Sequence, residues 1–321
     1  MILELDNVRK TFYKRTGVLS QEPIHAVVDV SLTLSKGDVL GVVGESGCGK
    51  TTVARCINGL QAVSSGSIKL DGVDIGHLGP RRFRPYRKRI QMVFQDPADS
   101  LNARFTVRRT LREPLALHTR TSRSDTEATL QRFMDVLGLR REHLDRYPHQ
   151  LSTGQQQRVG IARAIICNPD VVVLDEPTAA LDVSVRGKVL ELLLDLRARW
   201  GLTYVLISHD LATVRYVSDR TAVMYLGSVV EEGPTKSLFE SPHHPYTRAL
   251  LASIPSIAAR KQRIVPLGGE VPSPINRPSG CPFSTRCNDV MDVCRERMPG
   301  PVQVGDATVR CHLYPPDSVE A

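Results

Sequence analysis

The residues Gly44 to Thr51 read Gly-Glu-Ser-Gly-Cys-Gly-Lys-Thr, which fits the pattern G-x-x-x-x-G-K-[ST] of a phosphate-binding loop. The glycines allow a tight bend and let the backbone approach a phosphate with no Cβ in the way. Backbone N–H groups and the N-terminus of the next helix then attract the anion. Lys50 can reach the β- and γ-phosphates of a nucleotide, and the Thr51 hydroxyl can hold Mg²⁺.

The residues on either side of this loop favour the same interpretation. The apolar run Val39 to Val43 predicts a buried strand, and the run Thr51 to Leu60 is compatible with a helix. A glycine-rich turn with a chance lysine would not need this strand–loop–helix context. The pattern therefore predicts a nucleotide site in an α/β domain.

Two adjacent carboxylates end a second apolar run. Val171 to Leu174 is continuous and β-branched, which is typical of a central parallel strand buried on both faces. It leads into Asp175 and Glu176, at the strand end where open α/β sheets bind ligands. Asp175 can hold Mg²⁺ through water, and Glu176 can polarise an attacking water. Without the phosphate loop, this pair would be an ordinary acidic strand end.

A histidine follows the next buried strand, which we expect over Thr203 to Ile207. A lone histidine is more often structural than catalytic. His209, however, ends its strand at the same edge of the sheet as Asp175, which favours contact with a γ-phosphate.

Two further features are weak by themselves. Leu151 to Gln155 opens a helix predicted over Gln156 to Ile166, and its free N–H groups could bind an anion. Serine and threonine are also the usual helix N-caps. Phe12 could stack on a purine ring, or it could simply be an aromatic residue of an edge strand.

Alternation and turn residues predict the remaining elements. From Thr106 to about Ala164 the apolar spacing is helical, which indicates a helical insertion in the α/β domain. The other expected strands are Ile2 to Val8, Ala26 to Leu34, Ser67 to Leu70, Ile90 to Phe94, Thr221 to Tyr225 and Ser228 to Glu232.

The composition is that of an ordinary globular chain. The 321 residues suffice for one large domain, or for one large and one small domain. Met1 to Asp6 has no basic start, and no apolar stretch approaches the roughly 18 residues of a spanning helix. We therefore expect a soluble, cytosolic chain. The net charge of +8 could suit nucleic acid, an anionic membrane or only a solvated surface.

The last part of the chain differs in composition. From about Ser241 many prolines predict a loop-rich extension. It holds four cysteines in the pattern C-x5-C-x6-C-x16-C. In a cytosolic chain such a cluster suggests a metal more than disulfides. The four are Cys281, Cys287, Cys294 and Cys311.

In their order and spacing, the motifs resemble the ATP-binding subunits of ABC transporters over the whole chain. They are the phosphate loop, a glutamine loop at Gln95, a signature at Leu151 to Gln155, a Walker B strand at Val171 to Asp175, a D-loop at Ala180 to Asp182 and a switch histidine at His209. The resemblance implies an α/β P-loop NTPase fold, an ABC-type nucleotide-binding domain at 1–255 with a helical subdomain at about 96–165, and a small cysteine-containing extension at 256–321.

The resemblance also implies roles for individual residues. Catalysis would fall to Glu176, His209 and Lys50, and Mg²⁺ would be held by Thr51, Gln95 and Asp175. Two such domains sandwich two ATP molecules in the family, so Ser152 and Gly154 would face the γ-phosphate bound by the partner subunit. The implied ATP-binding residues are Phe12, Gly44, Ser46, Gly47, Cys48, Gly49, Lys50, Thr51, Thr52, Gln95, Ser152, Gly154, Asp175 and Asp182.

One residue departs from the family pattern. The signature usually has glycine where this chain has Thr153. A Cβ branch should be costly where backbones approach closely, and more so if φ is positive there. We expect a working but weakened half-site, which would suit a heterodimer with two unequal ATP sites.

The tail resembles a narrower group, the oligopeptide, dipeptide and nickel importer ATPases. Its marks are the run His243 to Leu251 and the later Gly280 to Phe283. The group's four-cysteine pattern is associated with an iron–sulfur cluster, and ligand count suits a [4Fe–4S] cube or Zn²⁺ equally. The resemblance implies a second ABC ATPase subunit, two membrane permeases, an extracytoplasmic substrate-binding protein and a place at the cytoplasmic face of the membrane.

Three other functions compete with uptake of di- or oligopeptides. Nickel or another small solute would be energised by the same motifs. A DNA-associated ABC ATPase would suit the charge and the arginines between 81 and 89, but no long heptad arm separates the phosphate loop from the signature. A metal-cluster regulatory protein would leave Glu176 and His209 without a role. We therefore expect no nucleic acid partner.

Overall fold

Parallel strands of apolar residues form the centre of the protein in this computed structural model, which describes residues 1–16, 21–253 and 268–315. The strand Val171–Asp175 lies between two parallel neighbours, and each of its residues is buried, which confirms the predicted central strand. In spatial order the parallel strands are β9 (Arg220–Tyr225), β3 (Val39–Val43), β8 (Thr203–Ile207), β7 (Val171–Asp175) and β6 (Ile90–Val93).

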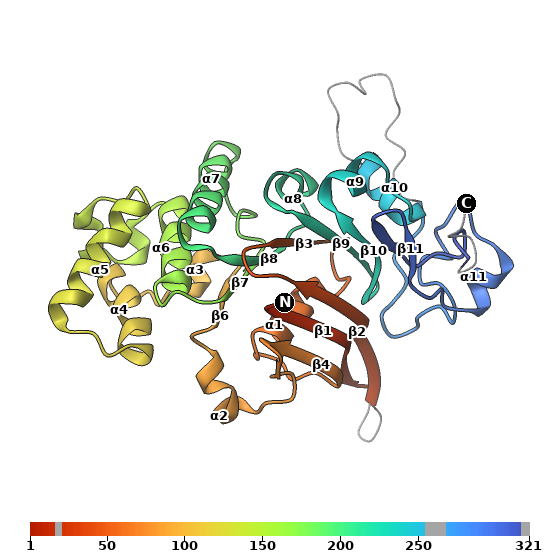
Figure 1. Cartoon of the computed structure of the whole chain (residues 1–321), viewed down its shortest axis with the longest axis horizontal. Helices are drawn as coiled ribbons and strands as arrows, with labels where there is room; N and C mark the ends of the chain where they lie inside the picture. The colour runs from red at the N-terminus through yellow and green to blue at the C-terminus, as the bar shows by residue number, and fades with distance from the viewer. Residues whose placement is uncertain (17–20, 254–267, 316–321) are drawn as a thin grey trace.

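The sheet separates two hydrophobic cores. Along β7, Val172 and Leu174 face one core, and Val171 and Val173 face the other. This follows from the two-residue period of a strand and explains why the run contains no polar residue before its end. In Figure 1, α1 (Lys50–Ile57) lies on one side of the sheet and α8 (Leu211–Val217) on the other.

Antiparallel strands extend the sheet beyond β9. The predicted first strand is longer than expected and continues past Phe12 to Arg15, because it pairs along its length with the second. Here the order is β5 (Val73–Asp74), β4 (Ser65–Leu70), β1 (Leu3–Arg15), β2 (Gln21–Leu34) and β10 (Ser228–Pro234). The link between β2 and β10 is short, a parallel pair at Ser228 and Asp29.

The predicted helical insertion is confirmed as a separate group of helices at one end of the molecule (Figure 1). Thr106 and Ser122 cap two of these helices, since their hydroxyls accept hydrogen bonds from Arg109 N and Asp125 N. The helices are α3 (Pro97–Ser100), α4 (Val107–His118), α5 (Arg123–Val136) and α6 (Thr153–Ile165), with 3₁₀ turns at Arg141–Asp145 and Pro148–Gln150.

The remaining helices cover the sheet or belong to its edges. The longest is followed by Gly201, whose φ of +61° in the left-handed region stops the helix. They are α2 (Pro80–Phe83) with a 3₁₀ turn at Arg84–Tyr86, α7 (Val183–Trp200), α9 (Thr235–Glu240), α10 (Pro245–Ala252) and α11 (Asp292–Glu296). Within the described ranges, no helix is both long and apolar enough to span a bilayer.

The tail is more regular than its prolines predict. A hairpin of β11 (Val302–Val304) and β12 (Ala307–Val309) joins the main sheet, because β12 pairs antiparallel with β10. Arg310 adds an ion pair of 2.6 Å to Asp29 in β2. The expected domain boundary between residues 255 and 256 lies outside the described residues, but the hairpin shows that the tail shares the sheet of the preceding domain.

A buried glutamate fastens β10 to the segment before α10. Glu231 is fully buried, and its two carboxylate oxygens accept hydrogen bonds from the backbone N–H groups of His243 (2.8 Å) and His244 (2.9 Å). Loss of the acceptor would leave two N–H groups without these partners, and an unpaired buried polar group is costly.

We predict that Glu231→Ala lowers the free energy of unfolding by about 2–4 kcal/mol, which is the cost of two unpaired buried donors. Urea unfolding followed by circular dichroism measures this loss. Glu240→Ala, at an exposed glutamate in α9, is the control and should change stability by less than about 0.5 kcal/mol. Equal stability of the two variants would contradict the assigned role of Glu231.

Candidate nucleotide-binding site

The loop between β3 and α1 is held against two other strands. Gly44 and Gly49 have φ values of +152° and +106°, in the region that favours glycine. A Cβ on Gly44 would lie 2.1 Å from Met224 O, and a Cβ on Gly49 would lie 2.3 Å from Ala26 O. No side chain fits at either position, so the backbone of the loop passes directly over β9 and β2.

Lys50 is the first residue of α1, and its ammonium turns back over the loop. Its Nζ donates to Gly44 O at 2.7 Å and to Glu45 O at 3.0 Å, and the residue is only 6% exposed. The charge is therefore kept at the N-terminus of a helix whose first N–H groups have no intrahelical acceptors. This arrangement concentrates positive potential at one point, as an anion site requires.

A hydroxyl and a carboxylate meet where β7 ends beside the loop. Thr51 Oγ1 donates to Asp175 Oδ1 at 3.2 Å. Burial raises the pKa of the Asp175 carboxyl, and the hydrogen bond from Thr51 opposes that rise. The two groups are hard oxygen donors, the kind that Mg²⁺ prefers.

The ends of β7 and β8 bring Glu176 and His209 together. Glu176 has an unusual φ of +47°, and its N–H donates to Ile207 O at 2.9 Å, which continues the pairing of the two strands by one residue. Its Oε2 lies 3.0 Å from His209 Nδ1, and the two side chains are 15% and 60% exposed. Two residues that the sequence places on neighbouring strand ends are therefore in direct contact.

These groups surround one open cavity of about 500 Å³. Most of the predicted site residues line it, including the exposed Gln95 from the segment after β6. Ala26 of β2 is the one lining residue that the sequence did not indicate. The lining residues are Ala26, Ser46, Gly47, Gly49, Lys50, Thr51, Thr52, Gln95, Glu176 and His209.

Three predicted residues lie beneath the residues that line the cavity. Gly44 packs on Met224, and Asp175 reaches the cavity only through its hydrogen bond with Thr51. Cys48 is buried, and burial raises the pKa of its thiol while the nearby Lys50 ammonium opposes this. These three residues therefore support the loop from beneath and do not line the cavity themselves.

Four others lie elsewhere on the chain. Phe12 is half-buried in β1, with the Lys10 ammonium 5.0 Å from its ring centroid. Ser152 and Gly154 stand at the start of α6, where Ser152 is the exposed N-cap. Asp182 is the exposed N-cap residue of α7. Within this chain, none of the four lines the cavity.

The signature helix begins earlier than predicted. It starts at Thr153, because Ser152 and Gln155 form reciprocal hydrogen bonds between side chain and backbone. Thr153 is thus an exposed residue of the first helical turn, and its φ is not positive. The backbone strain considered for this threonine is absent in the subunit itself.

The prediction of an iron–sulfur cluster, or of Zn²⁺, in the tail is wrong. Cys281, Cys287, Cys294 and Cys311 do line one cavity, but its volume is only about 10 Å³, room for no more than about one water. Within the described ranges, no group of three or more His, Cys, Asp or Glu side chains is arranged to hold a metal ion. Burial also raises the pKa of the Cys281 thiol to about 11.

The four cysteines are instead part of a closely packed tail. Cys281 and Cys294 belong to the larger hydrophobic core, together with Phe283. Cys281 N donates to Cys294 O at 2.8 Å, which draws the two segments together. The number and spacing of the cysteines therefore reflected packing, not a ligand set.

Sequence reasoning also missed contacts that hold the loop from outside. The Tyr246 hydroxyl accepts a hydrogen bond from Glu45 N at 2.9 Å, and Arg286 pairs with the Glu45 carboxylate. Tyr246 lies in the run His243 to Leu251, which carried the resemblance, so the only available signal was that motif.

Comparisons with known proteins agree with this fold and site. Residues 27–179 match the ABC transporter family, and residues 230–294 match the family described as the oligopeptide/dipeptide transporter C-terminal region. Oligopeptide transport ATP-binding protein AppF of Bacillus subtilis is 44% identical over 98% of this chain and 97% of its own length. Dipeptide transport ATP-binding protein DppF of Escherichia coli is 41% identical over 98% and 95%.

A solved structure supports the same assignment. The dimeric structure of MJ0796, a bacterial ABC transporter cassette, has a TM-score of 0.66 and 30% identity, and it covers 73% of this chain and 99% of its own. The chain therefore belongs to the ABC transporter family and is an ABC-type ATPase. Within that family, it is of the kind that carries the oligopeptide/dipeptide transporter C-terminal region, as its motifs predicted.

We predict that Asp175→Asn raises the melting temperature of the nucleotide-free chain. Because burial raises the folded-state pKa of Asp175, its charge opposes folding at neutral pH, and the isosteric amide removes that charge. The difference between variant and wild type should shrink as pH falls through the raised pKa, where the wild-type carboxyl gains a proton. Differential scanning calorimetry at several pH values measures both effects, and a variant less stable than wild type at pH 8 would contradict them.

Proposed function

We propose that this chain is the ATP-binding and ATP-hydrolysing subunit of an importer of dipeptides or oligopeptides, peripheral to the cytoplasmic face of the membrane. The observation that carries the proposal is the cavity that joins the phosphate loop to Glu176 and His209, on a chain that also has the transporter-specific C-terminal region. The similar relatives are named for oligopeptide or dipeptide transport, which favours peptides over nickel or another small solute.

ATP would bind with its phosphates in the loop. The backbone from Ser46 to Thr51 and the Lys50 ammonium would hold the β- and γ-phosphates, and Phe12 would stack on the adenine. Thr51, Asp175 and Gln95 would hold Mg²⁺, which neutralises phosphate charge. The hydrogen-bonded oxygens of Thr51 and Asp175 and the nearby Gln95 support this fit.

Hydrolysis would use the pair at the strand ends. The Glu176 carboxylate would accept a hydrogen bond from the attacking water and orient it toward the γ-phosphorus. His209, at 3.0 Å from Glu176 and on the cavity wall, would hold that carboxylate in place and contact the γ-phosphate. The bond between water oxygen and phosphorus would form as the bond to the ADP oxygen breaks, and Glu176 would accept the proton that the water loses, which yields ADP and phosphate.

A second ATPase subunit would complete the site. Ser152 and Gly154 of one subunit would face the phosphates bound by the other, and Asp182 would contact the partner near the reacting water. The exposure of Ser152 and Asp182, and the dimeric form of the similar cassettes, support this. We propose a heterodimer, because Thr153 replaces the usual glycine where the partner's phosphates approach. Two membrane permeases and an extracytoplasmic substrate-binding protein would complete the importer.

We predict that Glu176→Gln keeps ATP binding but lowers hydrolysis by about 10²–10⁴-fold, the usual contribution of a positioned general base. The amide keeps the shape of the side chain and can still contact His209. Phosphate release by the transporter reconstituted in liposomes measures the rate. The control is Glu191→Gln, at an exposed glutamate of α7, which should keep the wild-type rate. Hydrolysis by Glu176→Gln at that same rate would exclude the proposed role.

The partners can be identified directly. We expect affinity purification of the tagged chain from solubilised native membranes to recover two multi-spanning permeases and a second phosphate-loop subunit. The binding protein encoded beside them would then be tested with dipeptides, oligopeptides and Ni²⁺. Recovery of DNA in place of membrane proteins would overturn the importer proposal and favour a DNA-associated ATPase.

A further inference from the structure

The side chain of Glu45 is held by a residue from the opposite end of the chain. Arg286, in the loop before α11, forms a two-pronged ion pair with it: Nη1 lies 2.6 Å from Oε2 and Nη2 lies 3.0 Å from Oε1. The Arg286 side chain is only 4% exposed, and that of Glu45 is 24% exposed. A paired, shielded guanidinium of this kind fixes both the distance and the orientation of its carboxylate.

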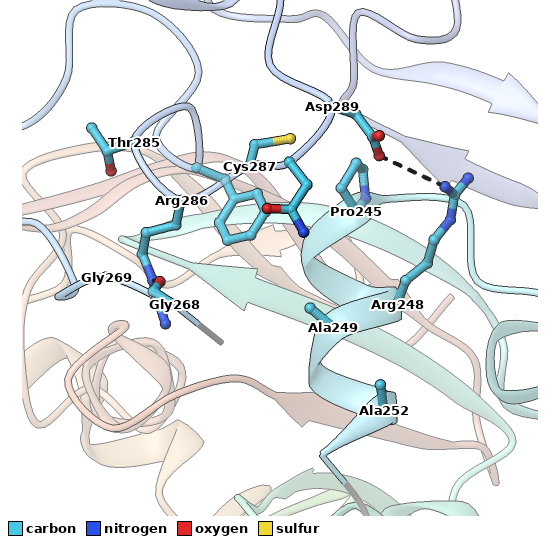
Figure 2. A pocket seen from close by; sticks show the side chains of 12 residues that line it. Pro245, Arg248, Ala249, Ala252, Gly268, Gly269, Thr285, Arg286, Cys287 and Asp289 are labelled. Carbon is cyan, nitrogen blue, oxygen red and sulfur yellow. Dashed lines mark hydrogen bonds and ion pairs between the residues drawn. The ribbon is translucent and has the colours of Figure 1, made fainter. Parts of the chain in front are cut away.

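Two further N–H groups of Arg286 also have acceptors, so that four of its five donors are used. Its Nε donates to Gly268 O at 3.0 Å, and its Nη1 also donates to the Tyr225 hydroxyl at 3.3 Å. Figure 2 shows Arg286 beside Gly268 and Gly269 on one side of a cavity of about 620 Å³. The guanidinium of Arg286 therefore has little freedom to move, and through Glu45 it restricts the position of the phosphate loop.

An aromatic cluster keeps this support rigid. Phe283, three residues before Arg286, packs on Tyr225 and Tyr246 with ring centroids 5.3 Å apart in each case, and the two tyrosine rings are 4.6 Å apart. Tyr246 is fully buried, and its hydroxyl accepts from Glu45 N at 2.9 Å. The tail thus contacts both the side chain and the backbone of the same loop residue.

The held residue is directly linked to the charge that binds phosphate. The Glu45 carbonyl accepts from Lys50 Nζ at 3.0 Å. A shift of Glu45 would move that carbonyl, and with it the position of the ammonium at the start of α1. A path of direct contacts therefore runs from Arg286 through Glu45 to Lys50.

We propose that Arg286 is a positioning residue for ATP binding, and that the C-terminal extension serves as an outer support of the phosphate loop. The inference rests on the proposed function of the site as an ATP site. Arg286 acts through Glu45 and touches no reacting atom. Without it, the loop and Lys50 would no longer be held in one position, and ATP affinity would fall.

The test measures the binding of a fluorescent ATP analogue, with Mg²⁺, to the full-length chain. We expect Arg286→Gln to weaken binding about 10–100-fold, the usual effect of removing a supporting contact behind a binding group. Arg286→Lys should recover part of the loss, since it keeps the charge but not the fork. Glu45→Gln should resemble Arg286→Gln, and the double variant should bind no more weakly than the weaker single variant.

Arg248→Gln is the matched control. Arg248 lies across the same cavity, where it faces Asp289 at 4.0 Å (Figure 2) and donates to Pro242 O and to the Tyr314 hydroxyl, away from the phosphate loop. This variant should bind the analogue within about twofold of wild type. Its melting temperature, measured beside that of Arg286→Gln, separates loss of stability from loss of affinity.

Two results would overturn the inference: a folded Arg286→Gln chain that binds within about twofold of wild type, or single losses that multiply in the double variant. If Arg286→Gln fails to fold, the affinity of Glu45→Gln for the analogue is the test. An affinity equal to that of the wild type would then overturn the inference. A wild-type chain that does not bind the analogue would remove the proposed function, and this inference with it. If the wild type binds the analogue and Arg286→Gln binds it with equal affinity, only this inference is removed and the proposed function stands.

Discussion

The nucleotide site depends on the absence of two side chains. At Gly44 and Gly49 the loop passes so close to the carbonyls of Met224 and Ala26 that a Cβ would overlap them. The loop can close only over strands that are already in place, so its shape is set by β9 and β2 as much as by its own residues. A phosphate loop of this kind is a property of the whole sheet, because the strands beneath it come from widely separated parts of the chain.

The same dependence reaches the tail. The hairpin of β11 and β12 extends the sheet through β10, Arg310 pairs with Asp29 in β2, and Arg286 pairs with Glu45. The first two connections join the tail to β10 and β2, and the third joins it to the phosphate loop itself. The extension is therefore continuous with the sheet and in contact with the phosphate loop, although its composition suggests an appended, irregular segment.

The sequence predicted the parts of the site that follow from local pattern. The continuous apolar runs ending at Val43 and Leu174 marked strands buried on both faces, and parallel strands necessarily bring Glu176 and His209 to one edge. The tail could not be predicted in this way. Strands of three residues show no periodicity, cysteine spacing does not reveal the size of a cavity, and nothing near Arg286 in the chain indicates its pairing with Glu45.

The contact between Arg286 and Glu45 joins residues 241 positions apart, which has a consequence during protein synthesis. Contacts between distant residues form late, and domains are completed as the chain leaves the ribosome. The phosphate loop leaves the ribosome before its arginine, which is made 241 residues later. A nascent or truncated chain would have every phosphate-loop residue without that support. Full nucleotide affinity would thus be reserved for chains in which the C-terminal extension has been made and has folded against the loop.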